Sequence, residues 1–369
     1  GWLKGQWQSE DIIIDELYMS GKLGAVSISG KRGNNDSIDF YAAFQAIHSA
    51  YIKAVDFKAY GVDFTLSAAA SVRGTLQMPV VDNAEVKVTG LKLGSVKQPD
   101  GTIIVNLRNN TATLTGNLLG SAIRWTSVTD LEEDGATEIV MDVQGLELDQ
   151  DELQAQTGSL LKDKHTLSAT GTIKAAGRLW GGLSLDGNAV LTSLGLKIPG
   201  YDIVNSQPVK IGFTHKSLTF KQAYLTAEGT KVKITGGLDR VGPAVSLQGV
   251  VDMKLLKKFT DEIVLAEGSV TPRLLLSGKW SKLYFLGEMG IDCSSLNVKT
   301  ASLKFSDVKG NVSLDQNTVA MNLGGKVSGG EFLASGTLQL ESLKPVAYEL
   351  VAALNGLNLR LLKCVPIGL

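Results

Sequence analysis

The chain has few cysteines and histidines, and this scarcity argues against several kinds of site. Its 369 residues include two cysteines, Cys293 and Cys364, which lie far apart in the sequence and belong to no CxxC motif. The three histidines, His48, His165 and His215, are dispersed, and none has a second ligand at the spacing that zinc sites use. The cysteines are expected to be small buried apolar residues. The sequence therefore predicts no metal and no cofactor.

Motifs of catalysis and phosphate binding are also missing from the sequence. There is no G-x-S-x-G nucleophile elbow, no H-E-x-x-H motif and no glycine-rich loop between a strand and a helix. The acidic runs "DLEEDG" at 130–135 and "DQDEL" at 149–153 lack the alternating oxygen spacing of an EF-hand loop. We interpret them as solvated turns. The sequence predicts that the protein is not an enzyme.

An excess of charge of one sign and a long apolar run are both lacking. Lys and Arg number 36 against 37 Asp and Glu, and the charges are scattered, so no basic stripe is available for nucleic acid. No run of about 18 apolar residues predicts a membrane-spanning helix. The opening "GWLKGQWQSED" is not a signal peptide and has no initiator Met. The chain is expected to be a piece of a longer protein.

Glycine and alternating apolar residues are abundant. The sequence has 41 Gly but only 8 Pro, and hydrophobic residues make up 44% of it. Segments such as "PVKIGFT", "KVKITGGL", "NTVAMNLGG" and "GTLQLES" place apolar residues at every second position, with Gly, Asn, Asp and Ser between the segments. This alternation is typical of strands that are buried on one face. The sequence predicts an all-β, mostly antiparallel sheet in which consecutive strands pair.

Three stretches favour short helices instead. In "DFYAAFQAIHSAYIKA", Phe40, Phe44, Ile47 and Tyr51 have helical spacing, which predicts a helix near 38–54. The stretches "DQDELQAQTGSLLKD" and "VDMKLLKKFTDEI" are the other candidates, the latter beginning after Asp252.

Two of these candidate helices belong to an internal repeat of roughly 105 residues. Related segments begin at Leu146, Val250 and Leu357, and the first two are followed by strands that end at Trp180 and Trp280. The repeat predicts four parts: an irregular N-terminal part at 1–145, repeats at 146–249 and 250–356, and the start of a further repeat at 357–369.

The apolar faces of so many strands must be covered. A string of immunoglobulin-like sandwiches is disfavoured because no cysteine pair brackets a Trp. A membrane barrel is disfavoured because aromatic residues make up only 6% and helices interrupt the strands. The remaining solution is an elongated sheet curled into a U-shaped groove with a few short helices. Such a groove suits acyl chains, since each buried CH₂ contributes about 0.8 kcal/mol.

Three segments resemble the repeats of TamB-like proteins in the AsmA-like superfamily: "GGEFLASGTLQL" at 329–340, "PVAYELVAALNGLNLRLL" at 345–362 and "LTFKQAYLTAEGTKVKITGG" at 218–237. The resemblance extends from about residue 140 to the end. It implies a β-groove in the periplasm of a diderm bacterium that conducts phospholipid between the inner and outer membranes, assists outer-membrane protein assembly, or both. It further implies a parent protein anchored in the inner membrane, with an outer-membrane assembly barrel as a possible partner. The matched residues include neither the anchor nor the partner-binding domain.

The groove hypothesis predicts the residues that contact lipid, namely the alternating apolar positions of the later strands. They are Val209, Ile211, Phe213, Leu218, Phe220, Val232, Ile234, Leu283, Phe285, Met289, Ile291, Val319, Met321, Leu323, Phe332, Leu338, Leu340, Tyr348 and Leu350. The alternative is a structural or adhesive β-repeat without a ligand, whose interior would be filled by its own side chains. A β-bulge would invert the face of every later residue in a strand, so the prediction depends on knowing which face each residue points to.

Overall fold

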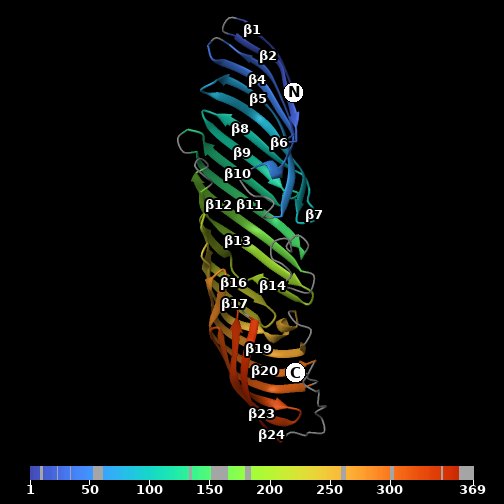
Figure 1. Cartoon of the computed structure of the whole chain (residues 1–369), viewed down its shortest axis with the longest axis vertical. Helices are drawn as coiled ribbons and strands as arrows, with labels where there is room; N and C mark the ends of the chain where they lie inside the picture. Colours follow the sequence, from blue (N-terminus) through green and yellow to red (C-terminus); the bar gives the residue numbers. More distant parts are fainter. Residues whose placement is uncertain are drawn as a thin grey trace. The chain divides into compact units, whose positions relative to one another are not determined.

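A computed structural model describes residues 1–8, 11–22, 24–33, 35–52, 61–132, 135–150, 165–178, 184–258, 263–299, 303–341 and 344–356. Hydrogen bonds join 24 strands into one sheet, and the strand pairs of the described residues are antiparallel, such as β1 with β2 and β23 with β24. The strands follow one another in chain order (Figure 1). The predicted all-β, mostly antiparallel fold is confirmed. In the described part of the chain, no helix is long and apolar enough to cross a membrane.

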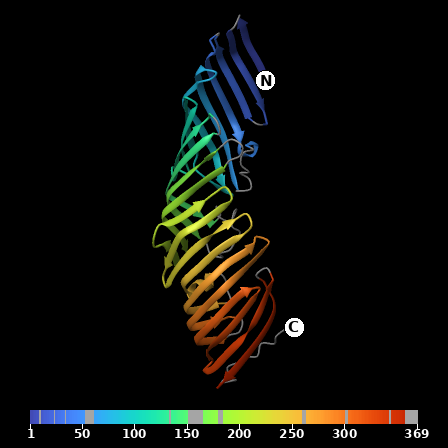
Figure 2. The same cartoon turned by 90° about the vertical axis from the view of Figure 1, so that its left-hand side faces the viewer.

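The chain divides into two compact units. The N-terminal unit comprises 1–159 and 166–192, and its first strands lie side by side in sequence order (Figure 2). Its strands are β1 (Trp2–Gln8), β2 (Asp11–Gly21), β3 (Gly24–Arg32), β4 (Ser37–His48), β5 (Val62–Thr75), β6 (Pro79–Leu93), β7 (Val96–Lys97), β8 (Gly101–Arg108), β9 (Thr111–Leu118), β10 (Ile123–Asp130), β11 (Ala136–Asp149) and β12 (Thr166–Arg178). The short β7 pairs with β6, which also pairs with β8.

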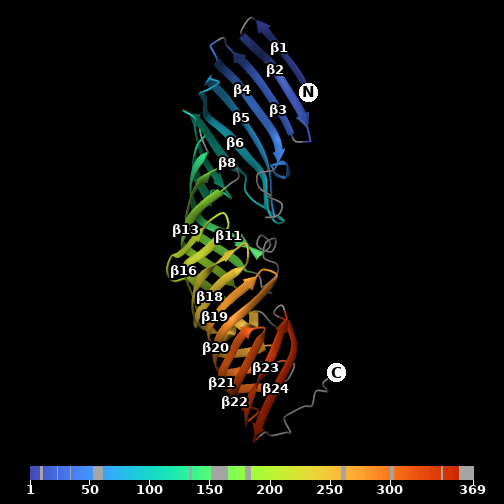
Figure 3. The same cartoon turned by 60° about the vertical axis from the view of Figure 1, so that its left-hand side comes forward.

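The C-terminal unit comprises 160–165 and 193–369, and the division falls within β13 (Ser184–Ile198). Its remaining strands are β14 (Tyr201–Asn205), β15 (Val209–Phe213), β16 (Ser217–Ala227), β17 (Thr230–Asp239), β18 (Pro243–Asp252), β19 (Ile263–Lys279), β20 (Lys282–Val298), β21 (Leu303–Gln316), β22 (Thr318–Val327), β23 (Gly330–Glu341) and β24 (Lys344–Asn355). Figure 3 shows the later strands of this unit following one another. The predicted repeat boundaries stay a prediction, although β11 crosses the one at 145/146.

β-bulges interrupt the alternation of apolar residues, and the same three-residue step between apolar residues recurs at four of them. The register shifts between Ile14 and Leu17, between Phe44 and Ile47, between Val143 and Leu146, and between Phe220 and Ala223. In each case two apolar residues three positions apart flank the bulge. Since a bulge inserts one extra residue, both flanking residues point to the same face of the sheet. The apolar face therefore continues across each bulge.

The predicted helix near 38–54 is wrong over most of its length, because residues up to His48 form strand β4. Only the 3₁₀ helix η1 (Ser49–Tyr51) follows, and residues 53–60 lie outside the described part. The helical spacing of Phe44 and Ile47 comes from the bulge between them, where Ala46 has a φ of 58°. A two-residue period with one inserted residue imitates a helical period.

The short helix predicted after Asp252 is confirmed as the 3₁₀ helix η3 (Met253–Lys258). Its start is fixed by the Asp252 carboxylate, whose Oδ1 accepts a hydrogen bond from the Lys254 amide at 2.8 Å. The third predicted helix lies almost wholly outside the described residues, which omit 151–164, and so does the repeat start at 357–369.

Candidate functional site

The candidate site is the apolar face of the C-terminal unit, which can be traced through the pairing of its strands. Directly paired residues of antiparallel strands lie on the same face, as do alternate residues of one strand. Between β15 and β16, Ile211 pairs with Phe220 and Phe213 with Leu218. Because Ile211 and Phe213 alternate with Lys210, the lysine lies on the opposite face.

The same face continues across every later ladder. From β17 to β19, Ile234 pairs with Leu247, and Leu247 pairs with Leu274. From β20 to β22, Val312 pairs with both Met289 and Met321. At the far end, Leu338 of β23 pairs with Val319 on one side and with Tyr348 on the other. The register therefore places every one of the predicted lining residues on one face.

We call the central part of this face the floor; it runs through Phe285, Met289, Met321, Leu323 and Leu338. These side chains are neither buried nor fully exposed. Among the predicted residues, Val209 and Phe332 are buried, while Tyr348 and Leu350 of the last strand are exposed. A floor of half-buried apolar side chains leaves surface that a ligand can cover. That these residues contact lipid stays a prediction.

At one end of strands β19 to β23, a small core closes the apolar face, and we call this core the packed corner. It consists of Met253, Ala266, Cys293, Val308, Val327 and Phe332. The ring of Phe305 meets that of Phe332 edge to face, with centroids 5.5 Å apart. The register between β21 and β22 shifts between Ser306 and Lys309. Val308 lies within this irregularity and Phe305 just before it, and both residues join the cluster because a bulge bends its strand.

The helix η3 closes the packed corner through Met253, and a polar network holds its N-terminal end. The Tyr201 hydroxyl bonds to the Thr230 hydroxyl, which accepts a hydrogen bond from the Asp252 amide at 2.9 Å. Burial raises the pKa of Tyr201 above its ordinary value, so the phenol stays neutral. Lys254 pairs with Glu228 at 3.1 Å. The network fixes where η3 starts, and thereby where Met253 enters the core.

Cys293 lies at the centre of the packed corner and is fully buried. Its thiol donates a hydrogen bond to the Ser295 carbonyl at 3.3 Å, and burial raises its pKa. A neutral, inaccessible thiol is a poor nucleophile and a poor metal ligand. Its expected role as a small buried apolar residue is confirmed. Cys364 lies outside the described residues.

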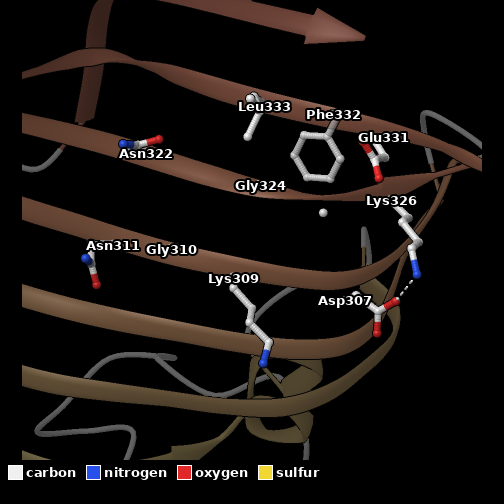
Figure 4. Close-up of a pocket in the computed structure, with 11 residues that line it drawn as sticks. Asp307, Lys309, Gly310, Asn311, Asn322, Gly324, Lys326, Glu331, Phe332 and Leu333 are labelled. Carbon is white, nitrogen blue, oxygen red and sulfur yellow. Dashed lines mark hydrogen bonds and ion pairs between the residues drawn. The ribbon is translucent and has the colours of Figure 1, made fainter. Parts of the chain in front are cut away.

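The opposite face of the same strands is more polar, although Leu275, Leu286 and Leu333 also lie on it. Figure 4 shows Lys309, Asn311 and Asn322 along this face, with Lys326 bonded to Asp307 at 2.9 Å near the bend of the strands. A shallow hollow of about 570 Å³ lies among them. No group of three or more metal-binding side chains gathers anywhere in the part of the chain that the structure describes. The two faces therefore differ mainly in the share of polar side chains that they carry.

The predicted lining residues include none from the N-terminal unit, which was expected to be the first part of the groove and where strand pairing shows a similar apolar face. There, Val105 pairs with Leu114, and Trp125 pairs with Met141. The apolar runs "TIIVNL" and "EIVMDV" concealed it, because adjacent apolar residues do not reveal which of them points inward. Pairing resolves the ambiguity: Val140 lies opposite Thr126, on the other face from Met141, and is 43% exposed.

Comparisons with known proteins add no relative: no family model, no curated protein and no solved structure matches the chain.

Proposed function

We propose that this protein binds phospholipid acyl chains along the apolar face of its sheet, as a segment of a groove that conducts lipid through the periplasm of a diderm bacterium. The observation that carries the proposal is the shared face from β15 to β24, on which most of the apolar side chains are half-buried. A sheet that exposes such a face to water gains free energy when hydrocarbon covers it.

The chemistry of the floor matches a flexible hydrocarbon chain better than a polar ligand. Each CH₂ that leaves water contributes about 0.8 kcal/mol, so an acyl chain gains affinity from many equivalent contacts. The binding needs no specific polar partner, and no single floor residue should be essential. This absence of a fixed pose suits movement of a lipid along the face.

The resemblance to TamB-like and AsmA-like repeats supplies the rest of the proposal. This remaining part of the proposal includes a parent protein anchored in the inner membrane, transport between the two membranes, assistance to outer-membrane protein assembly, and an outer-membrane barrel as partner. Binding of nucleic acid, a cofactor or a metal, and catalysis, form no part of it.

A second candidate is a structural or adhesive β-repeat without a ligand. The packed corner favours it, because there the protein fills its own apolar face with Phe332, Val308 and Cys293. The two candidates differ in what covers the floor, since a ligand-free repeat would keep its floor closed in solution.

Native mass spectrometry and lipid extraction of the purified 369-residue chain separate the candidates. We expect phospholipid to copurify with the wild-type chain and to be lost in Met321→Arg, because an ionised group on an apolar floor has no partner. The matched control is Ala320→Arg, which places the same charge on the opposite face. Absence of lipid from the wild-type chain, even after incubation with phospholipid vesicles, would favour the ligand-free repeat.

A further inference from the structure

Two turns of the C-terminal unit lie together at the same ends of their strands and expose apolar side chains. The β17–β18 turn contains Arg240 and Val241, and the β19–β20 turn contains Trp280. Val241 is 64% exposed and Trp280 is 52% exposed. We call these two turns, from Asp239 to Gly242 and from Lys279 to Lys282, the rim patch.

Hydrogen bonds fix the two turns against each other. The Trp280 amide donates to the Val241 carbonyl at 3.1 Å, and the Trp280 indole Nε1 donates to the Asp239 carbonyl at 2.8 Å. The indole nitrogen is thereby satisfied within the protein while about half of the side chain stays in water. An exposed Trp held in this way presents an ordered apolar surface, so little conformational entropy is lost when that surface is covered.

The rim patch is also cationic. Arg240, Lys279 and Lys282 are exposed, and among the described residues none of the three forms an ion pair. The one acidic side chain of the two turns, Asp239, directs its Oδ1 to the amides of Val241 and Gly242, at 2.7 and 2.9 Å. Three cations against one carboxylate leave the patch with a net charge of +2 (+3 − 1).

Two of the cations at the opposite ends of the strands have partners within the protein. There, Lys254 pairs with Glu228 at 3.1 Å, and Lys258 donates to the Pro199 carbonyl at 2.6 Å. Lys257 of η3 is exposed there and, among the described residues, forms no ion pair, so what distinguishes the rim patch is the combination of unpaired cations with exposed apolar side chains. A hollow of about 560 Å³ lies between the two turns of the rim patch, and its lining includes Lys279, Lys282, Tyr284, Val241 and the acidic residue Asp239.

We propose that the rim patch docks onto the surface of a bilayer that contains anionic phospholipid. The indole of Trp280 and the side chain of Val241 would enter the interfacial region, where Trp is favoured because it combines an apolar ring with a polar N–H. Arg240, Lys279 and Lys282 would contact lipid phosphates at the bilayer surface. The combination of exposed apolar groups with unpaired cations matches an anionic membrane surface better than a neutral one. This surface lies outside the floor and extends the proposed function to the place where lipid is exchanged.

Vesicle flotation of the full chain tests the proposal. With vesicles of equal parts phosphatidylglycerol and phosphatidylcholine at low salt, we expect the wild-type chain to float. The triple variant Arg240→Gln, Lys279→Gln, Lys282→Gln should bind at least about tenfold more weakly, since each cation near an anionic surface adds several-fold to the partitioning. Val241→Glu should also weaken binding, and it removes no hydrogen bond because Val241 bonds through its backbone.

The matched control removes three cations that are already paired: Arg273→Gln, Lys309→Gln and Lys326→Gln, whose partners are Glu288, Asp292 and Asp307. It changes the net charge equally and should float like the wild type. Equal flotation of both triple variants, or undiminished flotation in pure phosphatidylcholine, would overturn the proposal. So would a wild-type chain that binds soluble polyglutamate but no vesicle, which would assign the patch to an acidic protein. Met321→Arg should still float, so failure of the groove proposal is distinguishable from failure of this one.

Discussion

The packed corner and the floor belong to the same apolar face, but their side chains are buried to different extents. At the corner, Ala266 and Cys293 are fully buried, and Phe332 packs against Phe305. On the floor, Phe285, Met321 and Leu338 follow the same alternation and remain half-buried. Alternation alone therefore decides which face is apolar, while the bends of the strands decide where that face closes on itself.

This difference in burial implies different roles for the two regions, stability for the corner and ligand binding for the floor. A closed core stabilises the fold, because its contacts are lost only on unfolding. Apolar surface that stays partly open contributes less to folding and remains available for a ligand. Substitutions in the two regions should accordingly affect different measurements, stability for the corner and lipid content for the floor.

The largest effect on folding is expected at the corner. Phe332→Ala removes a buried ring from the cluster and should lower the free energy of unfolding by about 3–5 kcal/mol. Leu338→Ala, on the floor of the same strand, should cost less than about 1.5 kcal/mol. Urea denaturation followed by circular dichroism measures both. Equal losses would mean that the floor is packed as tightly as the corner.

The next effect is on lipid content. Phe213→Asp and Met321→Arg should each reduce the copurified phospholipid by about tenfold or more while the β-sheet spectrum is retained, because an unpaired charge interrupts the apolar face. Lys210→Asp, on the opposite face, should leave the lipid content unchanged. Lipid loss of the same size in Lys210→Asp would remove the distinction between the faces.

A smaller change should come from the backbone of the floor. Gly287 has a φ of +129°, and a Cβ there would lie 2.0 Å from the Arg273 carbonyl oxygen. Gly287→Ala should therefore cost about 1–3 kcal/mol. A Cβ on Gly324, which lies on the opposite face, would meet the flexible end of Leu333 at 2.9 Å and the Phe332 carbonyl oxygen at an ordinary contact distance of 3.7 Å, so Gly324→Ala should lie within about 0.5 kcal/mol of the wild type. A tolerated Gly287→Ala would show that the floor does not depend on this conformation.

The smallest effect concerns the network beside the packed corner. Tyr201→Phe removes the hydroxyl that bonds to Thr230 and should cost about 0.5–1.5 kcal/mol at neutral pH. Because the pKa of Tyr201 is raised in the folded protein, the neutral phenol favours folding below pH 10, and this contribution is lost as the pH rises through the folded pKa. The stability difference between wild type and Tyr201→Phe should narrow above pH 10. A difference that stays constant through that range would contradict the assigned environment of Tyr201.

Much of this architecture follows from local pattern. The two-residue period in segments such as "PVKIGFT" predicts both the strand and its inward face, and pairing places the predicted residues on one face. The period was misread where a bulge interrupts it. Phe44 and Ile47 look helical only because Ala46 adds one residue to a strand, and the same spacing recurs at Phe220 and Ala223. A search for strands with one three-residue step would have identified these bulges.

The packed corner could not be predicted from the local sequence pattern. Its members come from η3 and from β19 to β23, and nothing in the sequence near Cys293 or Val308 says which strand ends bend toward each other. The rim patch was also missed, because it depends on two turns separated by about forty residues being joined by the hydrogen bonds of Trp280. Long-range pairing, rather than local propensity, created both features.

The central claim, that the two faces of the sheet differ in contact with lipid, is tested most directly by photo-crosslinking. A photoreactive residue replaces Ile211 or Met321 on the floor side, and Lys210 or Ala320 on the other side, in chains incubated with phospholipid vesicles. The account predicts that probes at 211 and 321 capture phospholipid and that probes at 210 and 320 do not. Equal capture at the odd and even positions would contradict it.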